Sequence, residues 1–511
     1  MTEATTQREV ERKLAVGSEF VMPELTLSGA PTIAKQAAVT LVATYYDTED
    51  LRLARFGVTL RRRTGGSDAG WHLKLPASST DPGVRDEVQL PLSAGSAGMI
   101  PVELAELVLG MTRGAELAAR ATQRTRRTPT IIYGRTGEPD LEVVEDHVSI
   151  STGPLAGASY REVEVEVLGS QELMHVVVDL LRDAGAETSP STSKGVRAVA
   201  GDEPLAPVVP AVERARPKDS AAYAVTQHLR THVHALIHQD LRVRRGLPDS
   251  VHQFRVAARR LRSGLQAFAP LVDEPWARQL RAELGWIAGV LGAARDREVL
   301  ELRLFAGVRA LPGDLDRAAA FVAIQDHLEA ELAVANQQID QTLRSARYLG
   351  LLDALVAAAM LPPTTELAQE PTSEILPPLV RKRWRRLARE ANMLHDEVQG
   401  HDDHWHETRI TAKKARYTVE ACVPVFGTPA KKLAKQLELV TELLGEHQDC
   451  AIAADTIRSL LTRDTGPQAA FALGALYAQQ RSRTGQIRNE FILAWPQISH
   501  NEWREWLKVK A

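Results

Sequence analysis

The chain has 511 residues, of which 44% are hydrophobic and 25% charged, and its formal net charge is −3. This length allows two to four domains with a sizeable hydrophobic core. The near-neutral charge excludes a globally basic nucleic-acid-binding protein, so any site for a polyanion must be a local patch. Two cysteines, Cys422 and Cys450, are too few for a disulfide framework or a multi-thiolate metal site.

No segment of the sequence indicates a membrane protein or a secreted one. The polar N-terminal stretch, Met1–Arg8, lacks an apolar signal-peptide core. No apolar run approaches the ~20 residues that a membrane span needs. We therefore expect a soluble, cytoplasmic protein that has no membrane partner.

Residues 5–200 are predicted to form a β-rich domain, because β-branched residues alternate with polar ones between turn residues. The predicted strands are Glu9–Val16, Val39–Asp47, Gly57–Arg63, Gly70–Leu75, Arg85–Leu92, Gln123–Tyr133, Asp140–Ser149 and Ser159–Leu168. Two segments, Pro101–Val108 and Glu172–Ala184, are predicted to be helical.

Two of these strands carry regularly alternating charges. In a strand, Glu9, Glu11 and Lys13 share one face, while Val10 and its alternate neighbours share the other. The stretch 162–167 repeats this alternation with three glutamates and three valines. One such strand is equally typical of a half-buried surface. Two of them, separated by strands rich in Arg and Lys, predict a barrel with a charged interior and an apolar outer face.

Charges inside a barrel must be compensated, because an unpaired buried charge is very costly. The inward-facing acidic candidates are Glu9, Glu11, Glu87, Asp146, Glu164 and Glu166. The inward-facing basic candidates are Lys13, Arg61, Arg63, Lys74, Arg85, Arg124, Arg126 and Arg161. This set could neutralise itself through ion pairs. Alternatively, carboxylates that hold a hard divalent cation and guanidinium groups that hold phosphate suit a metal-bound polyphosphate chain.

Several blocks of this region occur together in one known family. They are Glu9-x-Glu11-x-Lys13, Tyr45-Tyr46-Asp47-Thr48, Gly57 to Arg63, Trp71 to Lys74, Arg85-x-Glu87, Asp146, Arg161 to Glu166 and Ser193-Lys194. With these blocks, residues 5–200 resemble the CYTH superfamily, also called the triphosphate tunnel metalloenzymes. Its members fold as an antiparallel β-barrel tunnel. They hydrolyse inorganic tripolyphosphate, thiamine triphosphate or nucleoside triphosphates, and some cyclise ATP.

The resemblance implies a set of site residues and a Mg²⁺ or Mn²⁺ cofactor. The implied metal ligands are Glu9, Glu11, Asp146, Glu164 and Glu166. The implied triphosphate-binding residues are Arg61, Arg63, Lys74, Arg85, Glu87, Arg124, Arg126, Arg161 and Lys194. Lys13 is the implied catalytic residue, which orients or deprotonates the attacking water. Gln89 stands where some members have a further glutamate, so the number of metal ions stays open.

The pattern of apolar residues changes after a proline-rich stretch, 201–217, which we predict to be a linker. Residues 218–505 have apolar residues at helical spacing and almost no strand pattern. A second polar, proline-rich break from Pro362 to Pro378 divides this region into two predicted helical bundles, 218–361 and 379–505. With the barrel, they give an α+β protein.

The two helical bundles repeat a basic motif at one constant offset. Its residues are His252, Arg255, Arg259, Arg260 and Arg262 in the first copy, and His406, Arg409, Lys413, Lys414 and Arg416 in the second. Most of them share one helix face, opposite an apolar face, and like charges at this spacing repel one another. The face either is solvated and paired with acids such as Asp296 and Asp449, or binds a polyanion.

The repeat, together with Leu291-Gly292 and Leu444-Gly445, resembles the CHAD domain over residues 218–505. That resemblance implies two pseudo-symmetric four-helix bundles with a basic cleft that binds inorganic polyphosphate. Gln448 stands where the first copy has Arg295, so the two copies need not bind equally.

Two classes of function follow from these patterns. The first is a metal-dependent triphosphatase, acting on inorganic triphosphate or on a thiamine or nucleoside triphosphate, whose helical part recruits long-chain polyphosphate or places the protein on polyphosphate granules. The second is a non-catalytic polyphosphate-binding protein. A nucleic-acid partner is not expected, because aromatic residues, which stack on unpaired bases, total only 5%.

Overall fold

The computed structural model describes residues 5–25, 27, 32–77, 81, 83–189, 193–211, 213–397, 401–462 and 465–508. The polar stretch Met1–Arg8 is therefore described only from Thr5 onward. The chain separates into two compact units, Met1–Val208 and Val209–Ala511. The boundary between these units lies within the predicted linker, 201–217.

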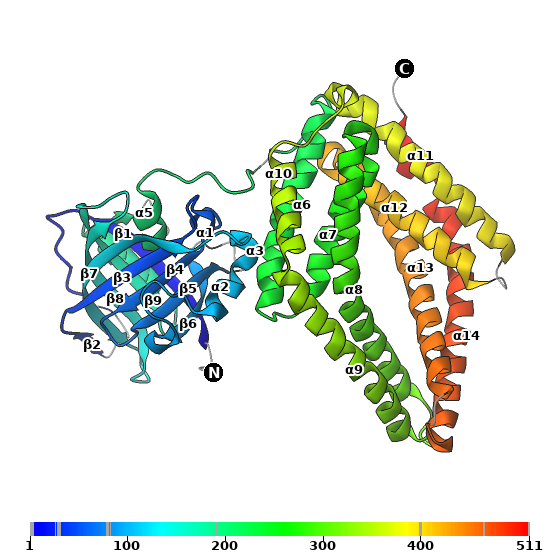
Figure 1. The fold of residues 1–511 in the computed structure, drawn as a ribbon, viewed down its shortest axis with the longest axis horizontal. Helices are drawn as coiled ribbons and strands as arrows, with labels where there is room; N and C mark the ends of the chain where they lie inside the picture. The colour runs from blue at the N-terminus through cyan, green and yellow to red at the C-terminus, as the bar shows by residue number, and fades with distance from the viewer. Residues whose placement is uncertain are drawn as a thin grey trace. The chain divides into compact units, whose positions relative to one another are not determined.

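The first unit contains a closed ring of antiparallel strands (Figure 1). Its strands are β1 (Thr5–Val16), β3 (Val39–Asp47), β4 (Thr59–Thr64), β5 (Gly70–Pro76), β6 (Val84–Pro91), β7 (Ala118–Tyr133), β8 (Pro139–Thr152) and β9 (Ser159–Val167). They pair in the order β1-β6-β5-β4-β3-β7-β8-β9, and β9 pairs with β1 to close the ring. Two short strands extend it, β2 (Thr32–Lys35) on β7 and β10 (Glu187–Thr188) on β1. The predicted antiparallel barrel is confirmed.

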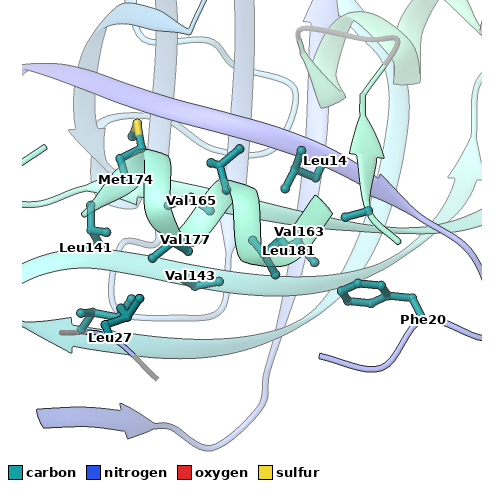
Figure 2. Packing of buried hydrophobic residues seen from close by; sticks show 13 residues of the cluster. Leu14, Phe20, Leu27, Leu141, Val143, Val163, Val165, Met174, Val177 and Leu181 are labelled. Carbon is teal, nitrogen blue, oxygen red and sulfur yellow. The ribbon is translucent and has the colours of Figure 1, made fainter. Parts of the chain in front are cut away.

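The apolar residues of the alternating strands form a core on the outside of the barrel. Helix α4 (Met174–Asp183) packs its buried face, including Val177 and Leu181, against this wall (Figure 2). The wall residues are Leu14 of β1, Ile132 of β7, Leu141 and Val143 of β8, and Val163 and Val165 of β9. Because apolar side chains leave the barrel on this side, the charged residues between them point inward.

A second helix, α5 (Lys194–Ala200), packs on residues of β3 and β7. Its Ala198 and Val199 form a buried cluster with Tyr45 and Ala121. The Ser193 side chain caps the helix by accepting a hydrogen bond from the Val196 amide at 3.3 Å. This packing holds Lys194 at the charged interior of the barrel. The remaining short helices of this unit are α1 (Arg52–Arg55), α2 (Val102–Leu107) and α3 (Leu109–Thr112).

Gly195 is expected to be essential for the docking of α5. A Cβ atom at this position would lie 2.6 Å from the Tyr45 ring and 2.8 Å from the Thr59 methyl group. We therefore expect Gly195→Ala to lower the free energy of unfolding by about 1–3 kcal/mol through overpacking, measured by denaturant unfolding. Gly17→Ala is the matched control, because a Cβ atom there meets nothing within 4 Å. Equal stability of the two variants would contradict the packing described.

The second unit is helical throughout its regular structure. Its first helices are α6 (Ala221–Arg244), α7 (Ser250–Ala267), α8 (Glu274–Ala310), α9 (Arg317–Arg344) and α10 (Ala346–Met360). They are followed by α11 (Thr372–Met393), α12 (Asp402–Phe426), α13 (Thr428–Leu461) and α14 (Pro467–Ile498). The repeated basic motif lies on α7 and α12, which pack against each other. None of the described helices combines the length and apolarity of a membrane span.

The first set of helices has a fifth member, α10, which packs on α6 and α8. One expectation about this unit needs correction. The predicted break ends early, because α11 starts at Thr372 and runs through Pro377 and Pro378, with its Leu376 and Trp384 buried. Burial of this face outweighs the backbone hydrogen bonds that the prolines remove.

The end of the predicted linker, 201–217, contacts the helical unit. Arg214 donates a hydrogen bond to the Pro424 carbonyl at 2.5 Å, and the Thr372 hydroxyl donates to the Pro217 carbonyl at 2.8 Å. This segment is thereby fixed to the helical unit.

Candidate functional site

The barrel encloses a cavity of about 300 Å³ that is lined almost entirely by polar side chains. Its acidic lining residues are Glu9, Glu11, Asp68, Glu87, Glu142, Glu164 and Glu166. Its basic lining residues are Lys13, Arg61, Arg63, Lys74, Arg127 and Lys194. The only aromatic residue among those that line it in the described part of the chain is Tyr45. Such a cavity suits a small, highly charged ligand.

The pairing of β1 with β9 gathers one group of carboxylates, Glu9, Glu11 and Glu166. Glu11 lies directly opposite Glu166 in the register of the two strands. Glu166 makes no ion pair or hydrogen bond with any described residue. Burial, together with the negative charges of Glu9 and Glu11, raises the pKa of Glu166 to about 7. An unpartnered carboxylate facing two others fits a site for a hard divalent cation.

Asp146, Glu162 and Glu164 form a second, buried group of carboxylates. Their oxygen atoms lie within 4.8 Å of one another, close enough to hold one metal ion. The Lys194 ammonium pairs with Asp146, with Glu162 at 2.7 Å and with Glu164 at 3.1 Å. Arg127 donates to both Asp146 oxygens, at 2.9 and 2.7 Å. Cations of the chain thus pair with each carboxylate of this group. Glu9 and Glu11 also pair with lysines, but their neighbour Glu166 has no partner among the described residues, so the group of Glu9, Glu11 and Glu166 keeps one carboxylate available for a metal.

Two lysines bridge the carboxylates inside the barrel. Lys74 lies 2.6 Å from Glu9, and Lys13 lies 3.0 Å from Glu11 and 3.2 Å from Glu164. Although burial acts in the opposite direction, Glu11 and Glu164 raise the pKa of Lys13. Lys13 is therefore held protonated, where it can orient a water or a phosphate oxygen but cannot accept a proton. Of its two predicted roles, orientation fits this geometry.

Two arginines of β4 carry unused hydrogen-bond donors in the cavity wall. The Nε atoms of Arg61 and Arg63 are buried and have no hydrogen-bond partner. Arg63 forms an ion pair with Asp68 of the β4–β5 turn. Burial, with the nearby charges of Arg61 and Arg127, lowers the pKa of Arg63 to about 9. Buried donors without acceptors are costly, and the guanidinium groups that carry them line the cavity, where arginine can bind phosphate oxygens.

Glu87 lies in the cavity wall but is already committed to its neighbours. His72 contacts its carboxylate at 3.1 Å, and Gln89 donates to it at 2.5 Å. Burial lowers the pKa of His72 to about 4, so this imidazole is neutral at physiological pH. Gln89 stands where some members of the family have a further glutamate. Its side-chain amide donates a hydrogen bond to the Glu87 carboxylate.

Four predicted phosphate-binding residues do not line the cavity. Arg124 and Arg126 are exposed on the outer face of β7, and the inward residue of that strand is Arg127. Arg161 also points outward and donates to the carbonyls of Gly17, Ser18 and Phe20. Arg85 is buried and donates to the Gly57 carbonyl at 2.6 Å. The predicted inward position is wrong for Arg124, Arg126 and Arg161. Arg85 does face the charged interior, opposite Glu9 and close to Glu11, but it does not line the cavity.

Asp146 also lies outside the cavity lining, fully buried beneath its ion pairs. Conversely, sequence reasoning missed Arg127, Glu142, Glu162 and Asp68 as interior or lining residues. The alternation along 162–167 does place Glu162 inward, whereas nothing periodic indicates Asp68, which belongs to a turn.

In the helical unit, cations of α7 and α12 converge where these two helices pack. Arg259 lies over the Tyr417 ring at 5.3 Å, and Arg255 contacts Asp296 at 2.9 Å. Burial, followed by the charges of Arg409 and Arg259, lowers the pKa of Lys413 to about 8. Arg255, Arg259, Arg409 and Lys413 lie close enough to interact electrostatically. We call them the basic cleft residues, after the cleft that the resemblance implies.

The other residues of the repeat face different neighbours. Arg416 is held by Glu420 at 2.7 Å and Glu438 at 2.5 Å, and Arg260 lies 4.0 Å from Glu420. His406 contacts Gln448 at 2.6 Å. Lys414 lies near Arg262, and His252 lines a separate hollow with Arg295. The two copies of the motif therefore contribute unequal sets of residues to the basic cleft.

If the basic cleft residues bind a polyanion, as the resemblance implies, the lowered pKa of Lys413 predicts that the affinity depends on pH. Lys413 loses its positive charge between about pH 7 and 9, so affinity for long-chain polyphosphate should fall over this range. Retention on immobilised polyphosphate at constant ionic strength measures the effect. Lys413→Arg keeps the charge and should remove most of the pH dependence. An unchanged profile in that variant would contradict a role for Lys413.

Two protein-family models match this chain, one in each of the two units. The CYTH domain model matches residues 7–198, and the CHAD domain model matches residues 227–458. The protein Rv2226 of Mycobacterium tuberculosis strain H37Rv is 32% identical over 517 residues, covering 95% of this chain and 95% of that protein. MT2285 of strain CDC 1551 matches with the same identity and coverage.

Solved structures also resemble parts of the chain. PptA from Streptomyces chartreusis is 24% identical, with a TM-score of 0.48, and the match covers 54% of this chain and all of that one. The CHAD domain from the plant Ricinus communis is 23% identical, with a TM-score of 0.43, covering 57% of this chain and 96% of that one.

Proposed function

The chain belongs to the CYTH and CHAD families, and from this premise we propose that its barrel hydrolyses inorganic triphosphate in a metal-dependent reaction. The observation that supports this most is the cavity, which combines the unpartnered carboxylate of Glu166 with the buried, unused donors of Arg61 and Arg63. Simple anion binding needs no carboxylates, because they would repel the ligand unless a cation intervened. A metal-bound triphosphate uses both signs of charge.

Glu9, Glu11 and Glu166 are the residues that would hold Mg²⁺ or Mn²⁺. A bound divalent cation would neutralise phosphate charge and polarise the phosphoryl group toward attack by water. Arg61, Arg63 and Lys74, with Arg127 and Lys194 opposite, would bind and align the phosphate oxygens. Lys13 would donate a hydrogen bond from its ammonium group and thereby orient the water or the terminal phosphoryl group.

The lining of the cavity favours an inorganic substrate over an organic triphosphate. A thiamine or nucleoside group needs an apolar or aromatic surface, and the described lining offers mainly Tyr45 and Leu168. The volume of about 300 Å³ also suits a short phosphate chain. We therefore expect tripolyphosphate to be turned over faster than thiamine triphosphate or ATP.

For the helical unit we propose binding of long-chain polyphosphate at the basic cleft, which would also bring the protein to polyphosphate granules. The supporting observation is the convergence of Arg255, Arg259, Arg409 and Lys413, with Asp296 and Asp449 as the nearby acids. Four cations held this close together repel one another, and this repulsion indicates an anionic partner.

A non-catalytic polyphosphate-binding protein is the second candidate, and the ion pairs of Lys13 and Lys74 inside the barrel favour it. A screen for phosphate release distinguishes the two. The purified full chain is incubated with tripolyphosphate, thiamine triphosphate or ATP, with Mg²⁺, Mn²⁺ or EDTA. Metal-dependent release supports the enzyme. If no substrate releases phosphate with either metal, the non-catalytic candidate replaces it.

A further inference from the structure

The outer wall of the barrel carries a hollow of about 630 Å³ on the part of β7, β8 and β9 that helix α4 does not cover. Six of its lining residues form what we call the outer-wall patch: Arg124, Arg126, His147, Ser149, Ser159 and Arg161. No acidic side chain is among the described residues that line this hollow. The arginines of this patch do not line the charged interior of the barrel.

Strand register arranges the patch in two rows. Arg126 lies opposite His147, which in turn lies opposite Arg161. In the next row, Arg124 lies opposite Ser149, which lies opposite Ser159. Opposite-charge pairs across neighbouring strands stabilise a sheet, and neither of these two rows contains one. The sequence thus concentrates basic groups where a sheet alone gains nothing from them.

Only part of this charge is neutralised within the chain. Glu145 accepts a hydrogen bond from Arg161 at 2.5 Å and contacts His147 at 3.3 Å. Arg161 is further occupied by the backbone carbonyls that follow β1. By contrast, the guanidinium groups of Arg124 and Arg126 are exposed and make no hydrogen bond or ion pair with a described residue. Two planar donor groups on one strand face are therefore available to a ligand.

We propose that the outer-wall patch is a separate phosphate-binding site that takes a linear polyphosphate chain through Arg124 and Arg126. Alternate residues of a strand lie ~7 Å apart, so the two guanidinium groups address different phosphates of one chain. The Ser159 hydroxyl continues the row as a neutral donor, while the Ser149 hydroxyl donates to the Arg124 carbonyl at 3.3 Å. Nucleic acid is the less favoured ligand. Tyr160, the only Phe, Tyr or Trp among the described residues of the lining, is covered by Arg197 at 4.0 Å.

The test uses the full chain with the basic cleft inactivated by Arg255→Glu and Arg409→Glu. Arg124→Glu with Arg126→Glu is added in this background, and retention on long-chain polyphosphate is measured. Arg55→Glu with Arg135→Glu is the matched control, since both arginines are exposed in the same unit and the change in net charge is equal. We expect the patch variant to lose at least about tenfold in affinity relative to the control.

Three outcomes would overturn the proposal: equal retention of the patch and control variants, no residual retention in the starting background, or tighter patch-dependent binding of single-stranded RNA than of polyphosphate. Thermal unfolding confirms that each variant is folded. Phosphate release from tripolyphosphate should be the same in all variants, because no patch residue lines the cavity. Failure of the proposed hydrolysis would show as no release in any of them, which does not affect the retention result.

Discussion

Replacing Glu9 or Glu11 by glutamine is expected to abolish phosphate release from tripolyphosphate while leaving retention on polyphosphate unchanged. Either change removes a negative charge from the group that contains Glu166, with almost no change in side-chain volume. The two carboxylates that remain in the group carry too little negative charge to hold a divalent cation tightly. Loss of one preorganised electrostatic contact typically costs about 10²–10³ in rate, and loss of the cation itself costs more.

Two measurements separate this effect from a general loss of structure. Glu172→Gln is the matched control, because Glu172 is exposed in the same unit. Metal affinity, followed by calorimetry in the absence of substrate, should fall in the Glu9 and Glu11 variants and stay constant in the control. If either variant releases phosphate at the rate of the unchanged chain, these carboxylates do not hold the catalytic metal.

The alternation of charged and apolar residues was sufficient to predict the barrel and most of its interior. It placed Glu9, Glu11 and Lys13 on one face because a strand has a strict two-residue period. β7 shows where that rule fails. It has arginines at 124, 126 and 127, so both faces carry a guanidinium group, and only the contacts of Arg127 with Asp146 and Glu164 identify the inward one.

Other parts of the site depend on contacts that have no periodic pattern. Asp68 reaches Arg63 from a turn, and Lys194 enters the interior because Gly195 lets α5 approach Tyr45 closely. In the helical unit, the constant offset of the repeat predicted the paired basic helices. It did not predict that Arg416 also contacts Glu438 of α13, because that contact depends on how the two helices pack.

Reversing two charges of the basic cleft, Arg255→Glu with Arg409→Glu, is expected to reduce binding of long-chain polyphosphate by orders of magnitude. Arg255 and Arg409 come from the two helices that pack together, so the double change converts attraction to repulsion on both sides of the cleft. These contacts are electrostatic, and their strength should depend steeply on salt concentration. Retention as a function of ionic strength measures both the affinity and its salt dependence.

Arg278→Glu with Arg458→Glu is the matched control, since both side chains are exposed on helices of the same unit and the net charge changes equally. The cleft variant should show a flatter salt dependence than this control, because fewer ions are displaced on binding. Release of phosphate from tripolyphosphate should be the same in both variants if the barrel acts alone. A cleft variant that binds polyphosphate as tightly as the control would mean that the repeated cations serve helix packing, and that the polyanion binds elsewhere on the chain.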